Sequence, residues 1–185
     1  MGNDLAHFMS QFLYGLIRSN ESRLAASLRG KWFRTRCFID TGVHIANKKN
    51  FQAGQGCALY HGSCILNTHG RFSMKRNSHL GAYCYVNVCH GKVEIGEDVA
   101  IGPGTKIIAY SNHYRKGKKV TEERITADIS IGNNVLIGAN CTILPGTKIS
   151  DNVIVAAGAV VKGMLEANNI YGGITAKIIT SGWYV

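Results

Sequence analysis

Proline is scarce in this 185-residue chain, which has 2 prolines beside 22 glycines. Glycine readily adopts the positive φ that tight turns need, so this composition favours many turns and few kinked helices. No stretch approaches the roughly 20 apolar residues that cross a bilayer, and the N-terminus shows no cleavable signal peptide. We therefore expect a cytoplasmic location, and the length of 185 residues favours one domain with a small appendage.

Acidic residues are also few, because 11 Asp and Glu stand against 21 Lys and Arg, giving a formal net charge of +10. Such an excess favours anionic partners, among them phosphate-bearing cofactors, nucleic acid and acidic membrane surfaces. The basic residues are scattered and no recognition motif for nucleic acid is present, so we expect no nucleic-acid partner.

None of the six cysteines forms the CxxC pair that zinc ribbons contain, so we expect no metal. In a reducing compartment the thiols stay free. The cysteines are Cys37, Cys57, Cys64, Cys84, Cys89 and Cys141.

The chain does contain a six-residue repeat. From residue 131 onward a large aliphatic residue returns every six positions, at Ile131, Ile137, Ile143, Ile149, Val155 and Val161. Four positions after each of these come mostly small or β-branched residues: Val135, Cys141, Thr147, Val153, Ala159 and Leu165. A period of six fits neither an amphipathic helix nor an alternating strand. It fits short strands joined by turns, three of which close one triangular coil that stacks on the next.

The repeat is weaker but still readable upstream, where triplets of inward residues start at the equally spaced Ala53, Met74 and Ile95. A coil made of three six-residue units would be three residues shorter than this spacing, so each of these coils is predicted to carry a short insertion at a corner. Three of the cysteines, Cys57, Cys84 and Cys141, fall in inward positions. We predict that they pack in the core, since no catalytic triad can be placed around them.

The first 36 residues lack the repeat. Leu5, Phe8, Phe12 and Leu16 recur at helical spacing, which predicts an amphipathic helix. Basic residues follow it: Arg18, Arg23, Arg29, Lys31, Arg34 and Arg36. We interpret residues 1–36 as a helical segment that covers the open end of the coil, where strand edges would otherwise be exposed. Peripheral membrane contact through the helix is the alternative.

A second interruption lies between Ile107 and Ile131. These two residues are four periods of the repeat apart, whereas an uninterrupted coil would place them one period apart. The three surplus periods are therefore extruded, and we place this loop at residues 109–129 within a repeat region of residues 37–170. Long loops on a regular scaffold are often functional. This one carries His113 near its base, for which a solvated surface histidine is the alternative. Residues 171–185 are expected to form a C-terminal tail.

The stretch from Ile131 to Val161, which begins Ile-Gly-Asn-Asn-Val-Leu-Ile-Gly-Ala-Asn-Cys, resembles the hexapeptide-repeat acyltransferases. Within that family it is similar to the O-acetyltransferases of galactosides, maltose, nodulation sugars, capsule and O-antigen. The resemblance is strong over about residues 93–180 and weaker over 50–92. It implies an all-β fold, a left-handed parallel β-helix, and a homotrimer with active sites between neighbouring prisms. It also implies transfer of an acetyl group from acetyl-coenzyme A to a sugar hydroxyl, within a pathway such as polysaccharide biosynthesis.

The resemblance also assigns roles to residues. His113, in Ser-Asn-His, stands where the family places its general base, and a near-neutral imidazole suits that task. Asn87 or Cys84 stands near the position of an asparagine that helps to hold the acceptor. Four residues correspond to family contacts with coenzyme A: Ala139, Ala157, Lys162 and Lys177. Lys162 replaces a common Thr or Ser, and in the closing motif Gly173-Ile-Thr-Ala-Lys177 an isoleucine replaces the usual proline.

Other functions remain open from the sequence. N-acetylation of an amino sugar is the second enzymatic hypothesis, since acceptor loops diverge freely. A γ-type carbonic anhydrase shares the fold, and His69 and His90 are spaced to stack on successive coils, but the loop offers only His113 as a further ligand. A non-enzymatic scaffold is the last alternative.

Overall fold

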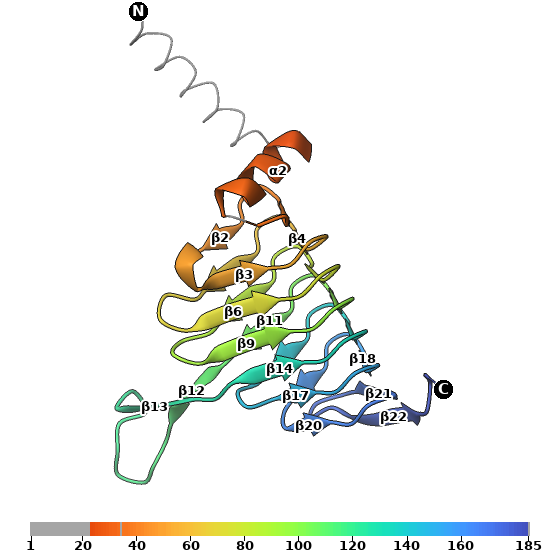
Figure 1. The fold of residues 1–185 in the computed structure, drawn as a ribbon. Helices are drawn as coiled ribbons and strands as arrows, with labels where there is room; N and C mark the ends of the chain where they lie inside the picture. The colour runs from red at the N-terminus through yellow and green to blue at the C-terminus, as the bar shows by residue number, and fades with distance from the viewer. Residues whose placement is uncertain (1–22, 34, 185) are drawn as a thin grey trace, which may run out of the picture.

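The computed structural model describes residues 23–33 and 35–184. In this part of the chain short strands wind around a tapering triangular prism, and each strand pairs in parallel with the strand one coil away (Figure 1). Only two strand pairs in the described residues are antiparallel, β12 with β13 and β21 with β22. The predicted left-handed parallel β-helix is confirmed.

The prism has three faces, each made of one hydrogen-bonded sheet. Face A contains, from top to bottom, β1 (Phe38–Ile39), β4 (Ala58–Leu59), β7 (His79–Leu80), β10 (Ala100–Ile101), β15 (Leu136–Ile137), β18 (Ile154–Val155), β21 (Asn169–Gly172) and β22 (Lys177–Ser181). Face B contains β2 (His44–Ile45), β5 (Cys64–Leu66), β8 (Tyr85–Asn87), β11 (Lys106–Ile108), β16 (Thr142–Ile143) and β19 (Val160–Val161). Face C contains β3 (Phe51–Ala53), β6 (Arg71–Met74), β9 (Lys92–Ile95), β14 (Ile129–Ile131), β17 (Lys148–Ile149) and β20 (Met164–Leu165). One strand from each face makes one coil.

The strand register reproduces the spacing expected from the sequence. On face A, Ala58 pairs with His79 and His79 with Ala100, at the longer spacing predicted for the upstream coils. Leu136 pairs with Ile154, at the spacing of three plain six-residue units. Ala100 and its partner Leu136 are separated along the sequence by twice this plain spacing. The fourth coil therefore contains an insertion that is as long as one further coil. The two short insertions, at residues 67–70 and 88–91, each lie between a strand of face B and a strand of face C. The long insertion leaves the prism at the same corner, which we call the B–C corner.

The core is a column of side chains along the axis of the prism. All six aliphatic residues of the period are buried, as are the six residues four positions after them. Upstream, Leu59, Ile65, Met74, Leu80 and Val86 continue the column, while Ala53 is partly buried and packs against it. The predicted register of inward residues is therefore confirmed.

Four asparagines and one aspartate turn one of the three corners. Between faces C and A, five residues have positive φ values of 52–62°: Asn77, Asp98, Asn134, Asn152 and Asn168. Asn and Asp tolerate this conformation better than other residues with a Cβ. Their side chains also form a ladder, since Asn134 Nδ2 donates to Asn152 Oδ1 at 2.9 Å and Asn152 Nδ2 donates to Asn168 Oδ1 at 3.0 Å. The corner residues thus stack in register like the core.

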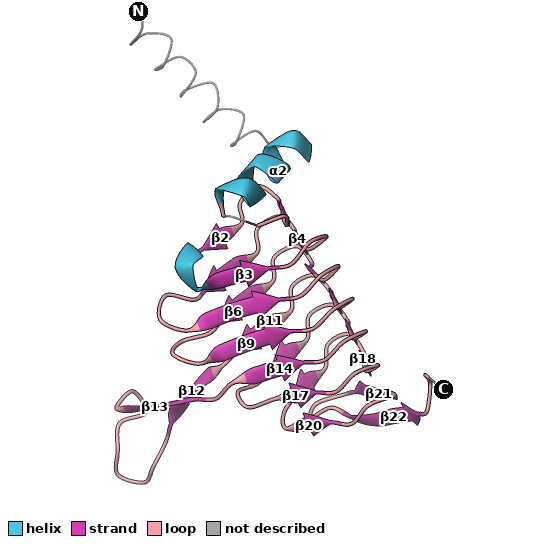
Figure 2. Cartoon of the chain, in the orientation of Figure 1, coloured by secondary structure: helices cyan, strands magenta, loops and turns pink. Residues whose placement is uncertain are grey.

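Helices occur only near the N-terminal end of the described chain (Figure 2). Helix α2 (Arg23–Trp32) lies over the first coil, with Ala25 and Ala26 buried, and a 3₁₀ turn, η1 (Lys48–Asn50), precedes β3. Gly30 allows the close approach, because a Cβ there would clash with the carbonyl oxygen of Cys37. The helix thus covers the open end. The predicted amphipathic residues Leu5–Leu16 lie outside the described residues, and no helix within these is long and apolar enough to cross a membrane.

Four of the six cysteines are buried, Cys57, Cys84 and Cys141 among them, and all six are free thiols. Burial raises the pKa of the Cys84 thiol to about 11 and that of the Cys37 thiol to about 12, because the core cannot solvate a thiolate. A thiol that stays protonated is a poor nucleophile. The predicted packing role of the three inward cysteines agrees with this burial.

The column makes a direct prediction about stability. Replacing Ile137, which is fully buried, by alanine should lower the free energy of unfolding by about 2–5 kcal/mol, since it leaves a cavity between coils. Leu136, its neighbour in β15, points outward and is 46% exposed, so Leu136→Ala is the matched control and should cost far less. Denaturant unfolding at one protein concentration measures both. Equal losses of unfolding free energy in the two variants would contradict the prediction that inward-facing side chains stabilise the fold more than outward-facing ones.

Candidate active site

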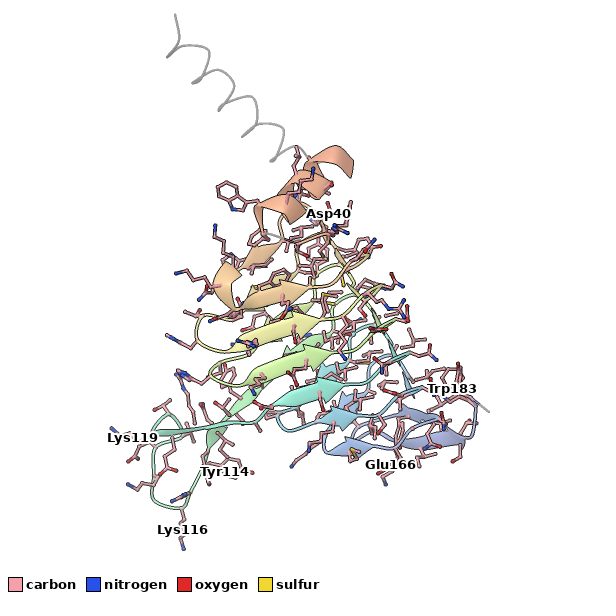
Figure 3. All side chains as sticks on the ribbon, viewed as in Figure 1. Asp40, Tyr114, Lys116, Lys119, Glu166 and Trp183 are labelled. Carbon is pink, nitrogen blue, oxygen red and sulfur yellow. The ribbon has the colours of Figure 1, made fainter. Side chains whose placement is uncertain are left out.

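The long insertion forms a β-hairpin that leaves the fourth coil at the B–C corner. Strands β12 (Tyr110–His113) and β13 (Glu123–Thr126) pair antiparallel, and the amide of Ala127 donates to the carbonyl of Ala109 to close the base. The hairpin projects away from the prism, with Tyr114, Lys116 and Lys119 toward its far end (Figure 3). It therefore presents an exposed surface next to the regular coils.

His113 ends β12 and lies directly opposite Glu123 in the hairpin register. Its side chain is 35% exposed, and its Nδ1 atom lies 3.9 Å from Oε2 of Glu123. Arg115 contacts both residues: its Nε lies 3.5 Å from Glu123 Oε2 and donates to His113 Nε2 at 3.4 Å. Because Nε2 of His113 accepts this hydrogen bond, a neutral His113 carries its proton on Nδ1, the ring nitrogen on the side of Glu123.

An open hollow of about 520 Å³ separates the hairpin from the coils below it. The hairpin supplies one wall, made of Ser111, Asn112, His113, Tyr114, Ile125 and Ala127. The other wall is the B–C corner of the next two coils, made of Leu144, Pro145 and Lys162. The hollow thus combines an imidazole, an ammonium group and apolar side chains, which is the usual make-up of a small-molecule site.

Two of the residues expected at the site, His113 and Lys162, meet at this hollow. Leu144 and Pro145 were not anticipated, although both follow the inward Ile143 and so had to fall at a corner. Glu123 and Arg115 were not anticipated either. Their contacts with His113 depend on the pairing of the hairpin, and no periodic pattern in the loop reveals that pairing.

Asn87 and Cys84, the two candidates for holding the acceptor, have different surroundings in the structure. Asn87, at the end of β8, is half-buried; its Nδ2 donates to the Tyr85 hydroxyl at 3.0 Å, and its Oδ1 accepts from the amide of Cys89 at 3.1 Å. It pairs with Ile108, so it lies one coil above the base of the hairpin. Cys84 is 2% exposed, and its thiol donates to the carbonyl of Gly102 at 3.2 Å. Neither side chain lines the hollow.

The other three residues that were expected to contact coenzyme A lie elsewhere on the prism. Ala139 and Ala157 follow β15 and β18, so they stack on successive coils at the A–B corner, where the amide of Gly158 donates to the carbonyl of Ala139. Lys177 begins β22, the last strand of face A. One chain therefore places His113 and Lys162 at one corner, and Ala139 and Ala157 at another.

The two stacked histidines were correctly paired from their spacing. The rings of His69 and His90 lie 4.9 Å apart between centroids and are inclined by 14°. Among residues 23–33 and 35–184, no group of three or more His, Cys, Asp and Glu side chains is placed to hold a metal ion.

Comparison with known proteins agrees with this geometry. The family described as bacterial transferase hexapeptide (six repeats) matches residues 128–163, which form β14 to β19 and the turns between them. This stretch of the chain is similar to the hexapeptide-repeat transferases. Of the curated relatives, galactoside O-acetyltransferase of Escherichia coli (strain K12) is 31% identical over 113 residues, or 58% of this chain and 56% of that protein. The chain thus spans little more than half the length of this relative.

A longer alignment joins the hexapeptide-repeat chain to WbbJ of the same strain, which is named for O-acetyl transfer in lipopolysaccharide biosynthesis. The two are 29% identical over 157 residues, 79% of this chain and 76% of WbbJ. Among solved structures, AntD, an N-acyltransferase from Bacillus cereus in complex with dTDP and 3-hydroxybutyryl-CoA, has a TM-score of 0.71 at 19% identity over 89% of this chain and 90% of AntD. A maltose O-acetyltransferase from Clostridium difficile 630 has a TM-score of 0.57 at 20% identity, covering 92% and 84%. These structures share the fold.

Proposed function

We propose that this protein transfers an acetyl group from acetyl-coenzyme A to a hydroxyl of a sugar or polysaccharide precursor. The observation that carries the proposal is the hollow in which His113, on the long hairpin, faces Lys162 across the B–C corner. The named O-acetyltransferases among its relatives support the same chemistry. The acceptor can be identified by measuring acetyl transfer to a panel of sugars. Amino sugars belong in this panel because AntD is an N-acyltransferase.

His113 is the general base in this mechanism. Its imidazole takes the proton of the acceptor hydroxyl while the hydroxyl oxygen attacks the thioester carbonyl. The tetrahedral intermediate then collapses, the carbon–sulfur bond breaks, and the proton passes from the imidazolium to the departing thiolate. The hydroxyl becomes an acetyl ester and coenzyme A leaves as the free thiol, so no external oxidant or metal enters the balance.

The contacts of His113 suit this role. Glu123 lies on the Nδ1 side, where a carboxylate favours the tautomer with its lone pair on Nε2 and stabilises the imidazolium that forms. Nε2 accepts from Arg115 in the structure, so an acceptor hydroxyl replaces this long contact when it binds. Arg115 remains beside Glu123 at 3.5 Å and limits the charge that the carboxylate presents to the imidazole.

The split between two corners supports a homotrimer. Ala139 and Ala157 lie one face away from the hollow that holds His113 and Lys162, so a coenzyme A bound between two prisms contacts the A–B corner of one chain and the hollow of its neighbour. A cyclic arrangement of three prisms brings the A–B corner of one copy to the B–C corner of the next and closes without unpaired interfaces. In this arrangement the pantetheine arm runs along the stacked backbone of Ala139 and Ala157, Lys162 stays beside the hollow, and the phosphates point toward the C-terminal region that contains Lys177.

The first functional prediction concerns His113. With acetyl-coenzyme A and a panel of sugars and amino sugars, His113→Ala should lower turnover by about 10²–10⁴-fold on the true acceptor. Release of the coenzyme A thiol measures the rate.

His44 provides the matched control, because it is an exposed histidine on the outer surface of face B in the first coil. His44→Ala should keep the rate of the wild type. Turnover that survives in His113→Ala would remove the histidine from the mechanism. Activity only on amino sugars would keep His113 but change the reaction to N-acetylation.

The second prediction concerns the phosphate end of the cofactor. Lys177→Glu places a negative charge where the proposal puts a cofactor phosphate, so coenzyme A should bind at least about tenfold more weakly by calorimetry. Lys106→Glu is the control, because Lys106 is an exposed lysine on the outside of face B. Circular dichroism should show that both variants fold. Equal affinities for the two variants would move the nucleotide to another part of the prism.

The third prediction concerns assembly. Light scattering should give three times the mass of one chain, and mixed trimers should show that the site is shared. His113→Ala and a variant with a blocked A–B corner, Ala157→Trp, should each be inactive alone. After joint refolding, trimers that pair an intact His113 with an intact A–B corner should regain activity. A monomeric mass, or no regain in mixtures that form trimers, would contradict a site between chains.

A further inference from the structure

Positive charge is concentrated in the N-terminal part of the sequence. Residues 1–76 contain 11 of the 21 Lys and Arg but only 3 of the 11 Asp and Glu. Residues 77–185 contain 10 Lys and Arg and 8 Asp and Glu, so they are close to neutral. A charge asymmetry of this kind points to an anionic partner at one end of the molecule.

The basic side chains of this end surround three hollows that share Thr35. The largest, about 480 Å³, is lined by Lys48 and Lys49, and the other two, about 430 and 300 Å³, by Lys31 and Arg36. All four side chains are exposed, and none of the described residues that line these hollows is acidic. We call these four residues the basic rim.

An aromatic side chain stands beside the basic rim. Trp32, at the end of α2, is 66% exposed, and Nζ of Lys48 lies 5.0 Å from the centroid of its ring. An indole has a large apolar body and one polar N–H, which suits the boundary between water and lipid. Phe33 and the buried Phe51 line the largest hollow beside Lys48, so this hollow combines apolar and cationic groups.

We propose that the basic rim and Trp32 dock this protein on a membrane surface with anionic lipid headgroups. Lysine and arginine side chains bind the phosphates, while the indole of Trp32 enters the headgroup region. This surface lies at the α2 end of the prism, whereas the hairpin leaves the fourth coil, so docking leaves the hollow at His113 open (Figure 1). The proposal is therefore independent of the acetyl-transfer proposal.

The composition of the surface favours lipid over nucleic acid. A duplex needs cations spaced along a stripe that follows its phosphates. The basic rim is instead a compact patch at the end of the prism, and its most exposed aromatic side chain is a tryptophan. Each Lys or Arg near an anionic leaflet strengthens binding by about fivefold, so four of them suffice for measurable docking when an interfacial tryptophan adds to them.

Co-sedimentation of the full-length protein with vesicles tests the proposal. The protein should bind vesicles of phosphatidylcholine with about 30% phosphatidylglycerol and should not bind pure phosphatidylcholine, and added salt should weaken the binding. The double variant Lys48→Glu/Lys49→Glu should bind the anionic vesicles at least about 25-fold more weakly. Equal binding to the two vesicle types would overturn the proposal.

The matched control places the same charge change on the hairpin. Lys116 and Lys119 are also exposed, and Lys116→Glu/Lys119→Glu should keep most of the binding. An equal loss in the two double variants would show that only net charge matters and would contradict a localised surface. Thermal unfolding of both variants confirms that they fold. Tighter binding to a short DNA duplex than to anionic vesicles, abolished by Lys48→Glu/Lys49→Glu, would assign the surface to nucleic acid instead.

Tryptophan fluorescence tests the insertion of Trp32. The chain has two tryptophans, so a Trp183→Phe variant reports Trp32 alone. Its emission should shift to shorter wavelength when anionic vesicles are added and should be quenched by lipids brominated along their acyl chains. An unchanged spectrum in vesicle-bound protein would mean that the indole stays in water, and docking through Trp32 would be excluded.

Discussion

The backbone hydrogen bonds between successive coils are the constraint on which the rest of this structure depends. A strand of two or three residues is too short to be stable alone, yet each strand between the first and the last coil pairs with the coils above and below it. Because each partner lies one whole coil away along the chain, every coil must have nearly the same path as its neighbours. A residue type that suits one coil then recurs in the next, in the core as at the corners.

This constraint explains which features could be read from the sequence. Ile131, Ile137 and Ile143 were placed correctly because burial of an aliphatic side chain at each turn leaves a period that nothing else produces. The surplus of chain before Ile131 located the hairpin for the same reason. The stacking of His69 on His90 followed from their separation by one whole upstream coil.

The same constraint explains what could not be read. The hairpin lies outside the ladder, so the pairing of His113 with Glu123 is set by local contacts and leaves no period in the sequence. Asn87 stands in the ladder, but its side chain bonds to Tyr85 and Cys89 within its own coil, which its position alone does not reveal. The hollow beside Leu144 and Pro145 depends on how the hairpin leans, and that angle belongs to no repeat.

The attachment of the hairpin has a consequence for how such a protein can change during evolution. The insertion begins and ends at one corner, and the amide of Ala127 closes its base on the carbonyl of Ala109. Lengthening, shortening or recharging the tip therefore changes no coil and adds little to the entropy of loop closure. Selection can alter the hairpin wall of the hollow while the column of aliphatic residues keeps the fold. The coils can thus stay constant while the hairpin diverges, because the hydrogen bond between Ala127 and Ala109 closes the insertion at its base.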